Sequence, residues 1–151
     1  MKVRDICKRQ VVTVRPQDEL LSAARVMRNK HVGYLVVVEP GLKAATIKPV
    51  GVLTDRDLVV SVMAREADPA ALSVSDVMTR ELVAACEEDS LSAALAQMRR
   101  LGVRRLPVIA ESGELTGVIS LDDIIDALAH ELSAVAGSIH AEQRVELALR
   151  S

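Results

Sequence analysis

The stretch Gly51–Leu58, which reads GVLTDRDL, recurs 66 residues later as GVISLDDI at Gly117–Ile124. In both places an apolar run of strand type ends in a hydroxyl residue, and an aspartate follows three positions later. This order indicates a strand that leads directly into a helix, once in each half of the chain. The two hydroxyl–aspartate pairs are Thr54 with Asp57 and Ser120 with Asp123.

The repeat continues upstream of this stretch at an offset of 71 residues. Met27 aligns with Met98 and Leu35 with Leu106, and the second copy has a shorter loop where the first has Glu39–Pro49. Self-similarity at one spacing is the mark of a duplicated structural unit. The sequence therefore predicts two copies of one unit, residues 1–73 and 74–136, followed by a helical tail, residues 137–151.

Each unit is predicted to fold as β-α-β-β-α. Asp18 and Asp89 are the expected N-caps of the first helices, whose apolar residues recur at helical spacing. Strands interleaved with helices predict an α/β fold in layers, and a three-stranded sheet with helices on one face needs a second copy to cover the other. The expected strands are Val11–Val14, Tyr34–Val38 and Pro49–Leu53, then Leu82–Ala85, Arg105–Ile109 and Leu115–Ile119.

The C-terminal part, Leu121–Arg150, is predicted to form one long helix or a helix broken near Gly137. Its apolar residues Leu128, Leu132 and Val135 fall on one face, and such a face needs something to cover it. The sequence leaves two options open, which are docking on its own domain and pairing with a second subunit.

Composition excludes several classes of protein. Half of the residues are apolar and 26% are charged, which excludes general disorder. Two cysteines without a CxxC motif predict no disulfide framework and no zinc site, and no metal site is expected from the histidines. There is no apolar run of membrane-spanning length and no signal-peptide pattern, so we expect a cytoplasmic protein. No catalytic motif is present, so we expect no enzyme.

The hydroxyl–aspartate pairs have two interpretations. A Ser or Thr followed by an acidic residue three positions later resembles a capping box, which is a purely structural device. An ionised aspartate at the same edge also suits the two vicinal hydroxyls of a ribose, because it only accepts hydrogen bonds. The sequence does not choose between them, and one residue can serve both roles.

These residues carry a resemblance to a known family. GVLTDRDLV in the first copy, and VRRLPVI and GVISLDDI in the second, resemble the pattern of a tandem pair of cystathionine-β-synthase (CBS) domains, a Bateman module. The resemblance spans residues 3–130, and the chain also looks like the short stand-alone bacterial proteins that consist of a CBS pair and little else. It implies two βαββα units related by a pseudo-twofold axis, packed through their sheets, with two equivalent clefts between them.

The resemblance also implies a set of ligand-binding residues. Each cleft would hold an adenosine-containing ligand, with one aspartate on its ribose. The ribose residues would be Asp57 and Asp123 with Thr54 and Ser120. The base would contact Tyr34, Leu35 and Val36 in one cleft, Arg105 and Pro107 in the other, and backbone groups of Thr13, Val14 and Ala84. The phosphate candidates are Arg56, Arg104 and Arg105.

The expected function is regulatory sensing of an adenine nucleotide. Several arginines and few aromatic residues favour AMP, ADP or ATP over S-adenosylmethionine, and differences between the copies predict two clefts of unequal affinity. A homodimer that signals to a separate protein in trans is expected. One alternative is a nucleic-acid or polyanion module that uses the basic N-terminal half, with Arg4, Lys8, Arg9 and Arg15. The other is a structural dimer that binds nothing.

Overall fold

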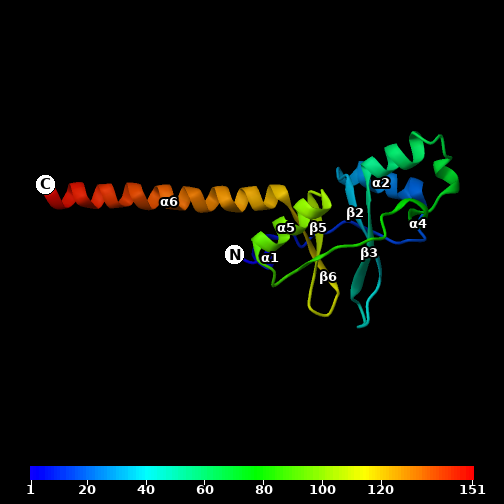
Figure 1. The fold of residues 1–151 in the computed structure, drawn as a ribbon, viewed down its shortest axis with the longest axis horizontal. Coiled ribbons are helices and arrows are strands. Elements are labelled where there is room, and N and C mark those ends of the chain that lie inside the picture. Colours follow the sequence, from blue (N-terminus) through cyan, green and yellow to red (C-terminus); the bar gives the residue numbers. More distant parts are fainter.

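The computed structural model describes all 151 residues, Met1–Ser151. Two small sheets lie beside each other, and one long helix projects from the second half of the molecule (Figure 1). The elements in chain order are α1 (Val3–Ile6), β1 (Thr13–Val14), α2 (Leu20–Lys30), β2 (Tyr34–Pro40), β3 (Ile47–Thr54), α3 (Asp55–Leu58), the π-helical turn η1 (Val59–Met63), the 3₁₀ turn η2 (Pro69–Ala71), α4 (Val74–Val77), β4 (Ala85–Cys86), α5 (Leu91–Leu101), β5 (Arg105–Ile109), β6 (Leu115–Ser120) and α6 (Leu121–Arg150).

The two sheets have the same topology, which confirms the α/β fold predicted from the repeat. Their strand orders are β1-β2-β3 and β4-β5-β6, with the first pair parallel and the second antiparallel. Tyr34 lies opposite Thr54 in one sheet, and Arg105 lies opposite Ser120 in the other. The register also shifts at equivalent places, after Val37 and after Val108. The duplication therefore extends to the details of strand pairing.

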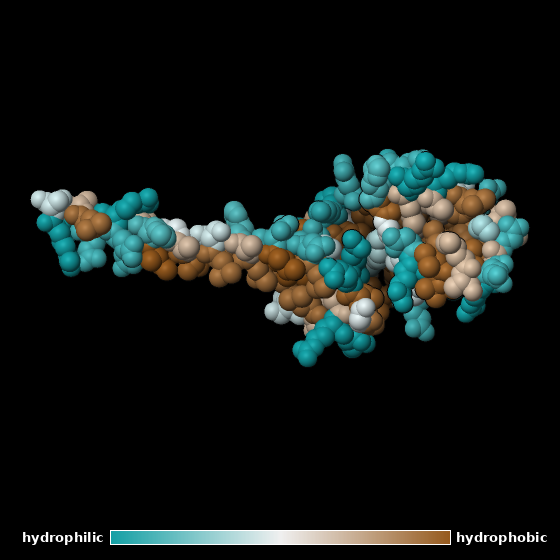
Figure 2. All heavy atoms as spheres, turned by 90° about the horizontal axis from the view of Figure 1, so that it is seen from above, coloured by the Kyte–Doolittle hydropathy of each residue, from teal (hydrophilic) through white to brown (hydrophobic).

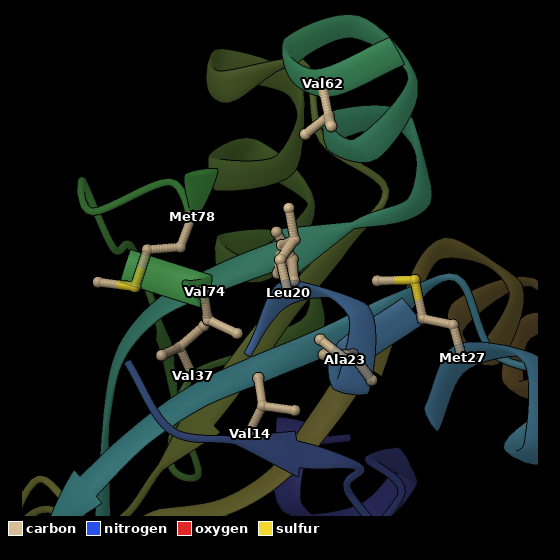
Figure 3. Close-up of a cluster of buried hydrophobic side chains, with 10 residues drawn as sticks. Val14, Leu20, Ala23, Met27, Val37, Val62, Val74 and Met78 are labelled. Atoms are coloured by element: carbon tan, nitrogen blue, oxygen red, sulfur yellow. The ribbon is translucent and has the colours of Figure 1, made fainter. Parts of the chain in front are cut away.

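Each half has its own apolar core, and each core receives a short helix from outside its sheet. The first core contains Val74 and Met78 from α4 and the residue after it (Figure 3). The second core contains Val3, which lies in α1 at the start of the chain. The leading segment of each copy thus packs with the sheet of the other copy.

Backbone hydrogen bonds join these exchanged segments to the sheets. Lys8 and Val118 donate to each other's carbonyls over 2.9 Å, and Thr79 and Val52 form the equivalent pair in the first half. The backbones approach closely because Gly117 has no side chain: a Cβ there would lie 2.7 Å from the Lys8 carbonyl oxygen. The two halves are therefore held together by main chain as well as by side chains.

The predicted N-caps were wrong by one residue. Asp18 and Asp89 instead accept backbone hydrogen bonds of 2.8 Å from Arg15 and Cys86, closing the turn after each first strand. The helices begin later, and in α5 the Ser90 hydroxyl is the cap, accepting from the Ala93 amide. Because Asp18 and Asp89 lie before their helices begin, their carboxylates accept hydrogen bonds from the turn and not from the first turn of the helix.

Helix α6 is unbroken from Leu121 to Arg150, so of the two predicted alternatives the single long helix is correct and there is no break near Gly137. The Ser138 hydroxyl donates to the Ala134 carbonyl within the helix. Beyond its first turns α6 projects away from the domain, and an apolar stripe runs along one side of it (Figure 2). The helix therefore does not dock on its own domain. None of the helices combines the length and apolarity needed to cross a membrane.

Candidate functional site

A cleft of about 290 Å³ lies between the two copies, and both contribute to its walls. On one side are residues that precede β1 and residues of the α2–β2 junction. On the other side are residues of β5, β6 and the start of α6. The lining consists of Lys8, Gln10, Val11, Val12, His31, Val32, Gly33 and Tyr34 from the N-terminal part, and Arg105, Val118, Ser120, Asp122 and Asp123 from the C-terminal part.

Ser120 and Asp123 form a capping box at the start of α6. The Asp123 Oδ2 atom accepts from the Ser120 amide at 2.9 Å and from the Ser120 hydroxyl at 2.7 Å, while the Asp123 amide donates to that hydroxyl at 3.1 Å. The side chain of Asp123 is only 9% exposed, and its Oδ1 atom lies 3.4 Å from the exposed Lys8 ammonium. The Oδ2 atom of Asp123 thus caps the helix, and its Oδ1 atom has the Lys8 ammonium as its neighbour at the cleft.

Thr54 and Asp57 repeat this arrangement at the start of α3. The Asp57 Oδ2 atom accepts from the Thr54 amide at 2.8 Å, and the Thr54 hydroxyl accepts from the Asp57 amide at 3.2 Å. The capping interpretation is therefore confirmed in both copies, with aspartate in the place of the usual glutamate. In each copy the cap occupies Oδ2 and leaves Oδ1 outside the box.

Tyr34 and Arg105 meet at the cleft. The Arg105 guanidinium carbon lies 5.8 Å from the centroid of the Tyr34 ring, within cation–π range. Burial raises the pKa of Tyr34 well above its ordinary value, and the positive charge of Arg105 opposes this only in part. The sequence placed these two residues in separate clefts, whereas both line the cleft that contains Asp123.

Several predicted site residues have side chains that are buried or half-buried. The side chains of Val14 and Leu35 belong to the first core, and Val36 and Pro107 are buried within their strands. Thr13 is half-buried and pairs with Val36, and Ala84 is half-buried just before β4.

Next to β1, the cleft is lined by the two residues that precede this strand, Val11 and Val12. Lys8 was missed because it reaches the cleft through the segment exchange, which leaves no local sequence signal.

Arg56 and Arg104, the other phosphate candidates, are exposed and do not line this cleft. An Nη atom of Arg104 lies 3.6 Å from an oxygen of Asp122. The repeat aligns Arg104 with Gly33 and Arg56 with Asp122. The first copy and the second thus carry different charges at equivalent positions.

The four basic residues that the sequence offers for a nucleic-acid surface each have a carboxylate neighbour. Arg4 bonds to Glu88 and Arg9 to Glu87, while Arg15 lies 3.6 Å from Asp18. The bond from Arg9 lowers the pKa of Glu87 below its usual range. Lys8 lies beside Asp123. Because each of these cations has a carboxylate neighbour, they form no free basic surface for a nucleic acid.

Comparison with known proteins gives one family. The family described as CBS domain matches residues 3–64 and 74–130. A CBS domain-containing protein of Bacillus subtilis, YhcV, is 35% identical over 122 residues, which cover 81% of each chain. An uncharacterised protein of Methanopyrus kandleri is 28% identical, and there the match covers 83% of this chain but 61% of the relative. Inosine-5'-monophosphate dehydrogenase of Korarchaeum cryptofilum is 32% identical, over 82% of this chain but only 23% of the enzyme.

Solved structures agree with this result. The CBS domain pair of protein MJ0100, crystallised with 5'-methylthioadenosine and S-adenosyl-L-methionine, has a TM-score of 0.73 at 19% identity, covering 87% of this chain and 98% of that one. A hexameric CBS-CP12 protein from bloom-forming cyanobacteria has a TM-score of 0.69 at 28% identity, covering 83% of this chain and 69% of that one.

Proposed function

The chain belongs to the CBS domain family and contains two CBS motifs, and on this premise we propose that it is a regulatory module that binds an adenine nucleotide between them. The observation that carries the proposal is that the two carboxylate oxygens of Asp123 have different surroundings. Its Oδ2 atom caps α6, while its Oδ1 atom lies at a cleft built from both copies. A ribose diol donating to Oδ1 would leave the cap intact.

The walls of the cleft suit an adenosine. Val11, Val12 and Val32 supply apolar surface for a base, and Tyr34 supplies the one aromatic ring of the protein. Arg105 holds its guanidinium beside that ring and can engage phosphate oxygens. The cleft volume of about 290 Å³ is at the small end of ligand sites, which fits one nucleotide.

The resemblance implies a second cleft, around Asp57, which we expect to be the more basic of the two. The positions equivalent to Gly33 and Asp122 are occupied there by Arg104 and Arg56. Exchange of a carboxylate for a guanidinium favours a ligand with more phosphate charge. We therefore propose two sites of unequal preference, with the Asp57 site favouring ADP or ATP and the Asp123 site favouring AMP.

The proposed role is sensing and not turnover. The relatives include a protein named only for its CBS domains, and the neighbour MJ0100 was crystallised with two adenosine-containing ligands. We propose that the protein acts in the cytoplasm as a homodimer and signals in trans to a separate protein. Ligand would alter that contact only by binding two states of the module unequally.

The test is a calorimetric titration with AMP, ADP, ATP and S-adenosylmethionine, using the wild type and the variants Asp57→Asn and Asp123→Asn. Asparagine retains an oxygen for the capping bond but loses the charge and one acceptor, so the fold is preserved while ribose binding weakens. We expect each variant to lose one of two binding phases. Wild-type affinity in both variants, or no heat from any of the four ligands with a folded wild type, overturns the proposal.

A further inference from the structure

The exposed face of α6 has the spacing of a helix that pairs with another helix. Its apolar residues follow each other at alternating intervals of four and three, which is the repeat that keeps one seam facing a partner. Leu132, in the middle, is 71% exposed. This seam consists of Leu121, Ile125, Leu128, Leu132, Val135 and Ile139.

The root of α6 also leaves a groove uncovered. In the first copy the chain bends at η1 and returns over α2, so that Val62 is buried to 3% exposure in the first core. The equivalent residue of the second copy, Leu128, is 48% exposed because α6 continues straight. A groove of about 370 Å³ remains at the start of α6, lined in part by Leu95, Val103 and Leu121. The groove and the seam share Leu121.

The exposed area is more than a stable pair of chains needs. A folded monomer of this mass exposes about 7,500 Å², whereas this chain exposes 10,029 Å². The excess of about 2,500 Å² is larger than the roughly 800 Å² that each partner buries in an interface of standard size. Figure 2 shows the apolar stripe continuing from α6 onto the domain.

The charges of α6 favour an antiparallel arrangement. Residues 121–135 carry four carboxylates and no Lys or Arg, while residues 136–150 carry two arginines and two glutamates. Parallel helices would place the two acidic halves side by side, whereas antiparallel helices place each acidic half beside the half with arginines. Antiparallel pairing is also favoured by the helix dipoles.

From these observations we infer that the seam of α6 pairs with the α6 seam of a second copy in antiparallel orientation, centred on Leu132. Ile125 then faces Ile139 of the second copy. The apolar residues after the seam, Val145, Leu147 and Leu149, are also exposed and depart from its spacing. In this arrangement they extend beyond Leu121 of the partner. This pairing specifies the homodimer of the proposed function, and it does not require bound nucleotide.

Sedimentation of the full chain without nucleotide tests the pairing. We expect a dimer, and we expect Leu132→Glu to weaken it by about 100-fold, because two carboxylates would face each other in an apolar seam. Ser133→Glu adds the same charge to the outer face of the helix and is expected to leave the dimer unchanged. A monomeric wild type, or a dimer that survives Leu132→Glu, overturns the inference. Calorimetry on Leu132→Glu tests nucleotide binding separately.

Disulfide formation tests the orientation, in a background with Cys7 and Cys86 replaced by serine. Ile125→Cys and Ile139→Cys are expected to cross-link with each other when the two variants are mixed. Each alone is expected to stay unlinked, whereas Leu132→Cys is expected to link to itself. Efficient self-linking of Ile139→Cys overturns the antiparallel arrangement.

Discussion

The guanidinium of Arg105 lies over the ring of Tyr34, 5.8 Å from its centroid, and the two residues occupy equivalent positions in the repeat. Each begins the second strand of its sheet, and each lies opposite the hydroxyl residue of a capping box. The pseudo-twofold relation between the copies therefore brings an aromatic ring and a cation together where identical copies would have placed two identical side chains. Because of this asymmetry, the cleft offers a ligand both an aromatic ring and a positive charge.

Tyr34 makes the cleft observable without a label. It is the sole tyrosine in a chain without tryptophan or phenylalanine, and it lines the cleft. We expect an adenine nucleotide bound beside it to change the intrinsic tyrosine fluorescence, saturating with the affinity found by calorimetry. Asp123→Asn is expected to weaken this response while Asp57→Asn largely preserves it. A response lost only in Asp57→Asn would place the ligand in the other cleft.

Tyr34 is also expected to titrate late. Because its pKa in the folded protein lies above the ordinary value of 10.0, the unfolded chain ionises first as the pH rises. The contribution of Tyr34 to the free energy of unfolding is therefore complete below pH 10 and falls above it. Tyrosinate absorbance and urea unfolding across this range measure both effects. Tyr34→Phe is expected to flatten the decline, and an unchanged decline in that variant would contradict this explanation.

The two capping boxes are expected to contribute to stability independently of any ligand. Ser120→Ala removes the hydroxyl that accepts from the Asp123 amide, and we expect a loss of about 1 kcal/mol in the free energy of unfolding. Urea unfolding in the absence of nucleotide measures it. Asp123→Asn, which keeps a capping oxygen, is expected to lose less. Equal losses in both variants would mean that the charge of Asp123 matters to the fold.

The close approach at Gly117 is expected to tolerate no side chain. An added Cβ would lie 2.7 Å from the Lys8 carbonyl oxygen, which is backbone and cannot turn aside. We expect Gly117→Ala to lower the free energy of unfolding by about 1–3 kcal/mol. Gly137→Ala is the matched control, since nothing lies within 4 Å of its added Cβ and alanine favours a helix. A neutral Gly117→Ala would show that the exchanged segment is held loosely.

Much of the fold was predictable because the chain repeats itself. The same apolar pattern occurs twice, so the β-α-β-β-α order and the strand ends near Thr54 and Ser120 were confirmed. The N-caps were wrong because an aspartate before a helix can close a turn as well as a cap. Asp18 and Asp89 do the former.

The site was less predictable than the fold. The hydroxyl–aspartate pairs were found from their spacing alone, and Ser120 and Asp123 do line the cleft. Strand alternation directs the side chains of Val14 and Leu35 into the core, so a contact of these residues with a ligand, which the resemblance implies, would have to use their backbone and stays a prediction. The contribution of Lys8 depends on which sheet its segment joins, and this is decided by contacts between residues more than a hundred positions apart.

The exchange of leading segments has an evolutionary consequence. Because α1 completes the second core and α4 completes the first, neither copy is a finished structure when cut from the chain at the repeat boundary. An ancestor with a single copy would have needed a second molecule, and each of the two would have supplied its leading helix to the core of the other. Gene duplication and fusion would then have converted this exchange between two molecules into an exchange within one chain, so that the two halves could diverge in sequence.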